Sequence, residues 1–141
     1  MSKQVWKPGT LLAPAPAALV TCGTMEKPNV LTVAWTGIIN SAPPMTYVSI
    51  RPERFSHHII EENREFVINV TTAELTRAAD FCGIRSGKDT DKFAEMKLTP
   101  VEASAVKAPL IDQSPISLEC KVKEVKRLGS HDMFIAEIVA V

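Results

Sequence analysis

Short apolar stretches rich in β-branched residues recur along this chain and predict a protein built mainly from strands. Most are continuous apolar runs, whereas the stretch from Ile116 to Val122 alternates apolar and polar positions, as a half-buried strand does. Turn signals separate them, such as Lys27-Pro28 and the glycine-containing segment 128–132. We expect strands at residues 17–23, 29–35, 45–50, 66–70, 116–122 and 133–141.

Helical patterns are few and short. Ser56 is placed to cap a helix that runs through Glu62, because its hydroxyl can accept a hydrogen bond from a first-turn amide. Thr71 and Glu74 have the spacing of a capping box and predict a second helix. The apolar face of that helix would consist of Leu75, Ala78, Ala79 and Cys82. A polar loop over 83–90 and one helical turn over 91–96 would follow.

Strands therefore outnumber helices, and their short links suit antiparallel hairpins. The fold class we expect is mainly β, a small β-barrel with short helices. No repeat and no glycine- or serine-rich linker divides the 141 residues, so residues 1–141 are expected to form one domain. The chain stops at Val141 inside an apolar, strand-like run, and we expect a further C-terminal segment in the intact protein.

Charge is distributed unevenly. Sixteen basic and sixteen acidic side chains give a net charge of zero, which does not favour a nucleic-acid-binding protein. Only four charged residues precede position 51, and none lies between Lys27 and Arg51. This uncharged stretch is long enough for a membrane helix, but the adjacent prolines Pro43 and Pro44 would break one. We expect the stretch to form core or interface, with no membrane association.

Several familiar sites are missing from the sequence. The three cysteines are far apart, which argues against a disulfide framework or a zinc ribbon and fits a reducing cytoplasm. There is no P-loop, no GxGxxG and no GxSxG motif. His57 and His58 would point about 100° apart on a helix. We therefore expect solvated histidines there and no metal site.

Two segments carry polar residues where a ligand could bind. Polar or aromatic residues interrupt the apolar run 29–37, namely Asn29, Thr32, Trp35 and Thr36, and the glycine that follows would let a flat ring approach the backbone. Arg51 and Ser56 flank the start of the first helix, where an arginine and free amides suit a phosphate. The structural alternative remains open: a core tryptophan, turn-stabilising side chains, a surface arginine and an ordinary helix cap.

Eight segments in order resemble the flavin reductase-like family, and more narrowly its flavoredoxin-type branch. They are P16-A-A-L-V-T-C, P28-N-V-L-T-V-A-W-T-G, N40-S-A-P-P-M, S49-I-R-P-E-R-F-S, F66-V-I-N-V, D80-F-C-G, D91-K-F and G129-S-H-D. The resemblance implies an antiparallel, Greek-key-like split barrel that binds FMN. It also implies a homodimer with the flavin near the subunit interface.

The resemblance assigns eight residues to cofactor binding. Those around the isoalloxazine ring and ribityl chain would be Asn29, Thr32, Trp35 and Thr36. Arg51 and Ser56 would serve the phosphate, Lys92 would supply a further cation, and His131 would lie beside the flavin. In other branches of the family an aspartate stands at the position of Ser130. Either Lys92 or His131 would stabilise the reduced, anionic flavin and raise its potential.

Three functions stay open at this point. The wider family implies an enzyme that reduces FMN with NADH or NADPH, while the flavoredoxin-type branch implies an electron carrier supplied by a redox partner protein. The third is a flavin-free binding module on the same barrel. No residue in the sequence stands out as a required general acid, since a nicotinamide can pass hydride directly to the flavin.

Overall fold

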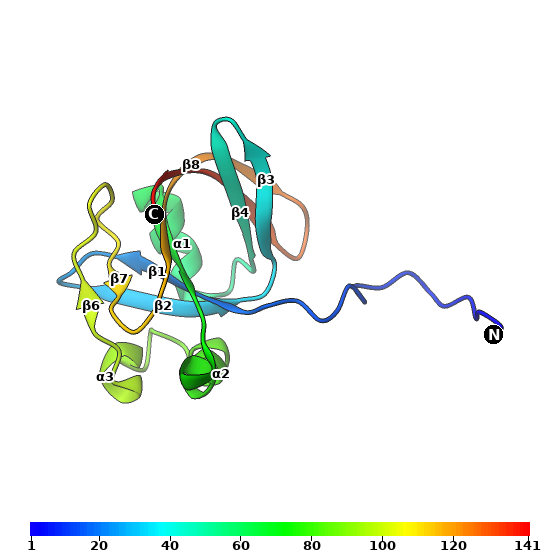
Figure 1. The fold of residues 1–141 in the computed structure, drawn as a ribbon, viewed down its shortest axis with the longest axis horizontal. Coiled ribbons are helices and arrows are strands. Elements are labelled where there is room, and N and C mark those ends of the chain that lie inside the picture. Colours follow the sequence, from blue (N-terminus) through cyan, green and yellow to red (C-terminus); the bar gives the residue numbers. More distant parts are fainter.

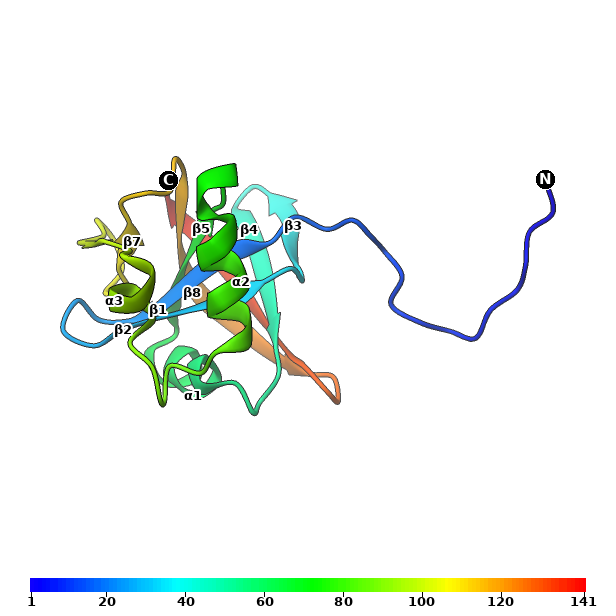
Figure 2. The same ribbon diagram turned by 90° about the horizontal axis from the view of Figure 1, so that it is seen from below.

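A computed structural model describes all residues from 1 to 141. Seven strands form one antiparallel sheet: β1 Ala18–Gly23, β2 Pro28–Val33, β3 Thr36–Ser41, β4 Pro44–Ile50, β5 Glu65–Val70, β8 Ser117–Arg127 and β9 Asp132–Ala140. A separate small hairpin consists of β6 Pro100–Val101 and β7 Leu110–Ile111. The helices are α1 Phe55–Asn63, α2 Thr76–Ile84 after a 3₁₀ turn at Ala73–Leu75, and α3 Lys92–Met96. Residues 1–17 form an extended arm that leads away from this body (Figures 1 and 2).

The order of strands explains why the sheet is rolled. Across the sheet the order is β2-β1-β5-β8-β9-β4-β3, so β2 and β3 lie at opposite edges. Only Ala34 and Trp35 connect them, and such a link spans no more than about 11 Å. The two edges must therefore approach each other, which bends the sheet into a split barrel. The mainly β, antiparallel fold predicted from the sequence is confirmed.

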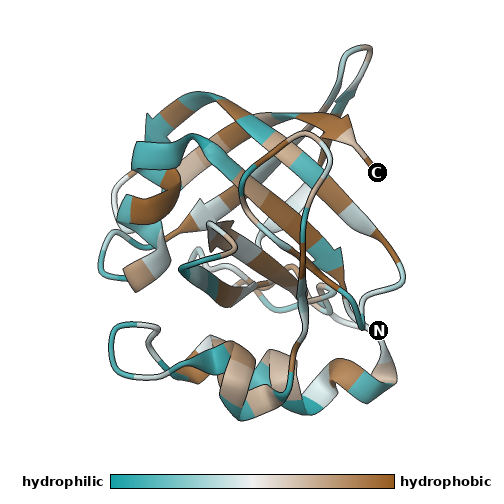
Figure 3. Ribbon diagram, turned by 90° about the vertical axis from the view of Figure 1, so that its left-hand side faces the viewer, coloured by the Kyte–Doolittle hydropathy of each residue, from teal (hydrophilic) through white to brown (hydrophobic).

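The barrel interior and the outer layer are two separate cores. Inside, α1 contributes Ile60 to a cluster that includes Phe66 of β5 and Phe134 of β9. On the other face of β1 and β2, Leu19 and Val30 pack against α2 and α3. Apolar residues covered on both faces account for the continuous apolar runs of these strands. Figure 3 shows the curved strands and the separate helical layer, with hydrophobic and hydrophilic positions interleaved.

The uncharged stretch from Pro28 to Ile50 divides between core and surface. β2 and alternate residues of β4 are buried, as expected. β3 was not expected as a strand, and its residues from Ile38 onward are exposed, with Ile38 itself 68% exposed. Because β2 ends at Val33, Trp35 lies in the two-residue link rather than in a strand. The β3 part of the uncharged stretch therefore forms an exposed, uncharged sheet edge and not core.

Two predicted helix caps are wrong. Arg54 occupies the N-cap position of α1, and Ser56 lies inside the helix, where its hydroxyl accepts a hydrogen bond from Asn29 at 2.6 Å. The Thr71 hydroxyl donates to the carbonyl of Ala17 at 2.6 Å, so it joins two chain segments instead of capping the following turn. In both cases a long-range partner takes the hydroxyl that a local cap would have used. The buried helix face predicted around Ala78 and Cys82 is confirmed.

His57 corrects another expectation. His58 is exposed, as expected, but His57 is buried and its Nε2 lies 2.7 Å from Asp132 Oδ2. All three cysteines are free and buried, and the structure contains no cluster of metal-ligating side chains. None of the helices has the length and apolar character that crossing a membrane requires.

Candidate functional site

Three adjoining hollows surround the start of α1, and together we call them the cleft. The Trp35 hollow, of about 230 Å³, lies between the β2–β3 link and the end of β4. The Arg54 hollow, of about 100 Å³, lies between that helix start and the segment after α2. The Lys92 hollow, of about 830 Å³, opens between α1, the β1–β2 turn and the loop before α3. Arg54 lines both the Trp35 hollow and the Arg54 hollow, and Lys92 lines both the Arg54 hollow and the Lys92 hollow. Shared residues therefore connect the three hollows.

The Trp35 hollow gathers four of the residues predicted to bind the cofactor: Thr32, Trp35, Arg51 and His131. The rings of Trp35 and His131 stack with their centroids 4.4 Å apart and tilted by 33°. Trp35 keeps 44% of its surface exposed, so an aromatic face remains available. Thr32 instead directs its hydroxyl to the carbonyl of Ala79 on α2, at 2.5 Å. The hollow thus offers a flat apolar surface beside cationic side chains.

His131 lies in the turn between β8 and β9. The hydroxyl of Ser130 lies 2.9 Å from Nδ1 of His131, so this serine provides a hydrogen-bond partner for the imidazole. Burial lowers the pKa of the His131 imidazole, and the positive charge of Arg51 adds to that effect. The ring is therefore biased towards its neutral form until an anion enters the hollow.

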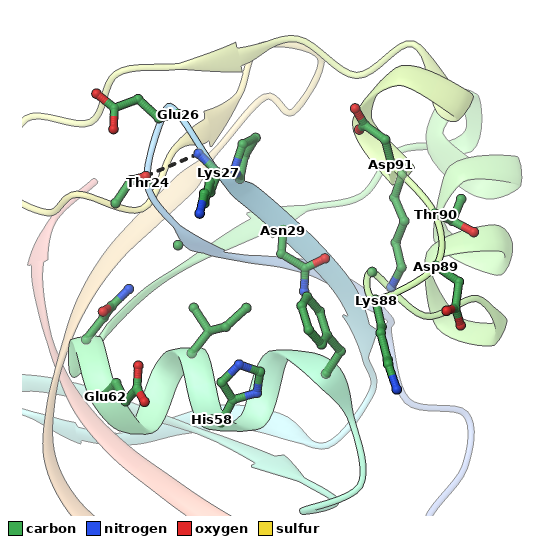
Figure 4. A pocket seen from close by; sticks show the side chains of 17 residues that line it. Thr24, Glu26, Lys27, Asn29, His58, Glu62, Lys88, Asp89, Thr90 and Asp91 are labelled. Carbon is green, nitrogen blue, oxygen red and sulfur yellow. Dashed lines mark hydrogen bonds between the residues drawn. The ribbon is translucent and has the colours of Figure 1, made fainter.

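Asn29 lines the Lys92 hollow, and Figure 4 shows it between α1 and the loop before α3. The Asn29 amide donates to Ser56 and also approaches the Cys22 sulfur at 4.0 Å. Burial raises the pKa of the Cys22 thiol to about 11, although hydrogen bonds from Ser56 and Asn29 oppose the rise. This thiol is therefore an inert packing group. Gly87 sits so close that an added Cβ would be 2.0 Å from the Asn29 Oδ1 atom.

Lys92 is the buried cation of the cleft. Its side chain is on the first residue of α3, after the Asp91 carboxylate that caps the helix. The ammonium donates to the carbonyls of Val30 at 2.8 Å and Cys82 at 3.0 Å. Burial lowers the pKa of Lys92 to about 8, because the charged form loses hydration. A buried cation of this kind gains from an anion close by.

Arg54 is a site residue that the sequence reasoning missed. One guanidinium nitrogen donates to the carbonyl of Gly83 at 2.8 Å. A second nitrogen, Nη2, is buried without any hydrogen-bond partner, and no other buried side-chain nitrogen or oxygen in the structure lacks one. Native proteins leave few buried polar atoms unpaired, so this one needs an explanation. The signal that could have identified Arg54 is its position between Arg51 and Ser56, the two residues predicted to bind the phosphate.

The eight predicted residues do not form one cluster. Asn29 and Lys92 line the larger hollow, and Ser56 contacts Asn29. Thr36 lines none of the three hollows, and its hydroxyl donates to the Tyr47 carbonyl across the β3–β4 hairpin at 2.7 Å. The structure therefore brings seven residues to the cleft region and leaves the Thr36 side chain engaged elsewhere.

Comparison with known proteins now identifies the family. Residues 11–141 match the family described as the flavin reductase like domain. The chain belongs to this family. An uncharacterised protein of Archaeoglobus fulgidus is 36% identical over 92% of this chain and 73% of its own length. An NADH-dependent FMN reductase of Rhizobium rhizogenes is 28% identical, over 73% of this chain and 57% of its own.

Solved structures of the flavin reductase-like family agree in fold. The flavoredoxin of Desulfovibrio vulgaris (Miyazaki F) is 35% identical with a TM-score of 0.90, covering 99% of this chain and 75% of that one. The flavoredoxin of Methanosarcina acetivorans is 26% identical with a TM-score of 0.89, over 99% of this chain and 74% of that one. The resemblance inferred from the eight segments is confirmed at the level of family.

Proposed function

We propose that this chain binds FMN in the cleft and acts as a flavin oxidoreductase that accepts reducing equivalents from NADH or NADPH. The observation that carries the proposal is the buried, unpartnered Nη2 of Arg54. A buried donor without an acceptor costs free energy that a bound phosphate oxygen would recover. Membership of the flavin reductase-like family makes FMN the group that supplies such a phosphate.

The start of α1 suits the phosphate of FMN. No side chain caps the first turn of α1, so the amides there that precede His57 remain available for an anion. Arg54 stands at the N-cap, and Arg51 lies exposed at the mouth of the Trp35 hollow. A guanidinium offers paired donors in a plane, which match phosphate oxygens better than a point charge does. We assign the phosphate to Arg54 and Arg51, with Ser56 shaping the adjoining wall through Asn29.

The ring of the flavin requires an apolar surface and a cation. Trp35, stacked on His131, provides the aromatic face, and Thr32 closes the hollow on the side of α2. Lys92 or His131 would hold positive charge against the reduced ring and so raise its potential. When bound, FMN supplies the redox chemistry, accepting a hydride and releasing electrons one or two at a time. The side chains of this chain bind, orient and charge-balance it.

An electron-carrier function is the second candidate. It is favoured by the 35% identity to a flavoredoxin whose fold matches nearly the whole chain. In that case a redox partner protein, rather than a nicotinamide, would supply the electrons. Both candidates place FMN in the same cleft and differ only in the donor.

Purified protein distinguishes these functions. We expect a yellow protein, or an apoprotein that binds added FMN stoichiometrically and releases it on denaturation. Mixing the complex with NADH or NADPH in a stopped-flow instrument should bleach the flavin absorbance rapidly if the chain is a reductase. Slow bleaching by both nicotinamides would favour the carrier. A colourless protein that binds no FMN would overturn both and leave a flavin-free binding module.

We also propose that two copies of the chain associate through β3. This strand is an unpaired edge with uncharged, exposed residues, among them Ile38 and Ile39. Exposed apolar edges of this type are uncommon in monomers because they promote association. Light scattering should give twice the chain mass, and Ile38→Lys should reduce it to one chain. A monomeric parent protein would contradict the proposal.

A further inference from the structure

The buried pair of His57 and Asp132 links the two walls of the cleft. His57 lies in the first turn of α1, and Asp132 is the first residue of β9. The histidine Nε2 and the carboxylate Oδ2 are 2.7 Å apart, and both side chains are buried. The edge of the His57 ring also packs against Phe134 at a centroid distance of 5.2 Å, which fixes its orientation. Neither residue lines any of the three hollows.

Two further charged groups complete this network. Arg127, paired with Asp132 across the β8–β9 hairpin, donates to the same carboxylate at 2.7 Å. Its second nitrogen contacts Glu61 of α1. Burial would raise the pKa of Asp132, but hydrogen bonds from His57 and Arg127 outweigh it and hold the pKa below its usual value. Asp132 is thus a carboxylate that needs both partners.

Each end of the network is adjacent to a residue of the cleft. Asp132 directly follows His131, and the turn that carries His131 is closed by a hydrogen bond from Leu128 N to the His131 carbonyl. His57 directly follows Ser56, and its amide donates to the Arg54 carbonyl at 3.0 Å. One buried pair therefore joins the backbone that carries His131 to the backbone that carries Arg54.

We propose that His57 is a positioning residue: through Asp132 it holds His131 stacked on Trp35 and sets the spacing of the two cleft walls. A buried, hydrogen-bonded polar pair is seldom a source of net stability, since an apolar pair of equal volume often serves as well. What such a pair supplies is a defined geometry, and here that geometry ends at His131 and Arg54. The role of His57 in FMN binding rests on the proposed function, whereas the test of its effect on His131 uses the apoprotein and needs no FMN.

The fluorescence of Trp35 is a measurement of this positioning that needs no flavin. The chain has two tryptophans, so Trp6→Phe in the extended arm leaves Trp35 as the only tryptophan, and excitation at a wavelength that Tyr47 does not absorb makes it the only emitter. We expect emission from Trp35 to respond to the protonation of the stacked His131 ring, because an imidazolium quenches an indole more strongly than a neutral imidazole does. The other charges facing His131 are Arg51 and Glu53, and both remain unchanged in the variants below. A pH titration of the apoprotein therefore reports the surroundings of His131.

Three variants in this background test the proposal. His57→Leu removes the donor to Asp132, and we expect the titration midpoint of Trp35 emission to move towards the ordinary histidine value and the FMN affinity to fall roughly tenfold. His57→Gln, whose amide can still donate to Asp132, should restore most of both. Glu119→Leu is the matched control, because Glu119 is a buried carboxylate holding the amides of Ser104 and Ala105 outside the cleft.

The outcomes separate positioning from simple destabilisation. All variants are compared at a temperature where circular dichroism shows them folded. An unchanged midpoint in His57→Leu, or an equal shift in Glu119→Leu, would overturn the proposal. If the midpoint shifts but no variant binds FMN, the positioning role stands and the proposed function fails. If FMN binds equally to all while the midpoint is constant, only the positioning role fails.

Discussion

Two buried polar clusters, one around Asn69 of β5 on the outer face of the sheet and one around Arg54 and Lys92 in the cleft, differ in how completely their hydrogen bonds are made. On the outer face, the Asn69 amide donates to Leu19 O and Thr21 Oγ1, and its oxygen accepts from Ile111 N and Ser117 Oγ. In the cleft, Arg54 keeps one buried nitrogen without a partner. The first cluster is saturated, whereas the second has a donor left over.

The difference indicates which cluster serves the fold and which serves a ligand. A saturated network fixes the β6–β7 segment against the sheet and has no capacity for another molecule. The cleft holds a buried cation in Lys92 and an unpaired donor in Arg54, both of which are costly without an anion. Three changes test this contrast, from the largest expected effect to the smallest.

Removing the Asn69 amide should destabilise the fold most. Asn69→Leu removes a hydrogen-bond partner from the buried backbone groups of Leu19 and Ile111 and from the half-buried Ser117 hydroxyl, so we expect the free energy of unfolding to fall by about 4 kcal/mol. Denaturant titration measures it. FMN affinity below the melting temperature should stay within twofold. A large loss of FMN affinity in the folded variant would contradict the view that the Asn69 cluster serves the fold and only the cleft serves a ligand.

Lys92 should leave a signature in the dependence of stability on pH. Its pKa is about 8 in the folded chain and near the ordinary lysine value when unfolded, so the unfolded chain binds more protons between these values. The penalty for burying the charge is therefore complete below pH 8 and disappears as pH rises towards 10.4.

The comparison with Lys92→Met removes the titration of this lysine, and because the Lys92 charge lowers the pKa of the Cys22 and Cys82 thiols, both pKa values rise further in the variant. We expect the stability of the parent relative to the variant to increase by up to about 3 kcal/mol from pH 8 to 10.4. Urea titrations at several pH values measure the difference. Parallel curves would show that Lys92 carries no buried charge.

Arg54 should affect binding without supporting the fold. Arg54→Met loses one hydrogen bond to Gly83 but also removes the unpaired donor, so stability should change by less than about 1 kcal/mol. FMN affinity should fall by roughly 30-fold, about 2 kcal/mol, as for loss of a charged hydrogen bond. Fluorescence titration measures the affinity. Arg85→Met, from the same hollow, is the control and should retain most of it.

The strands could be predicted where local pattern and burial agree. β1, β2 and β5 form continuous apolar runs because both faces or the barrel interior cover them, and their positions were close to those expected. β3 was missed because it is exposed from Ile38 onward and shows neither alternation nor a continuous apolar run. The caps failed because the side chains of Ser56 and Thr71 have partners far away in sequence.

The site could be predicted only in part. Thr32, Trp35, Arg51 and His131 meet in one hollow, whereas Asn29 and Lys92 line another and Thr36 lines neither. Arg54 was missed because its sequence context is that of a solvated helix flank. His57 was misplaced because burial of a helix surface depends on what packs there, and Asp132 lies 75 positions away.

By itself, the sequence determined the mainly antiparallel β character, the family and the set of residues that bear chemistry. These follow from periodicity, residue type and the order of short segments, all of which are local. Only the tertiary structure decided that a two-residue link rolls the sheet, that Arg54 keeps an unpaired nitrogen, and that His57 binds Asp132. Each of these depends on which distant groups share a buried space, and no local pattern encodes that.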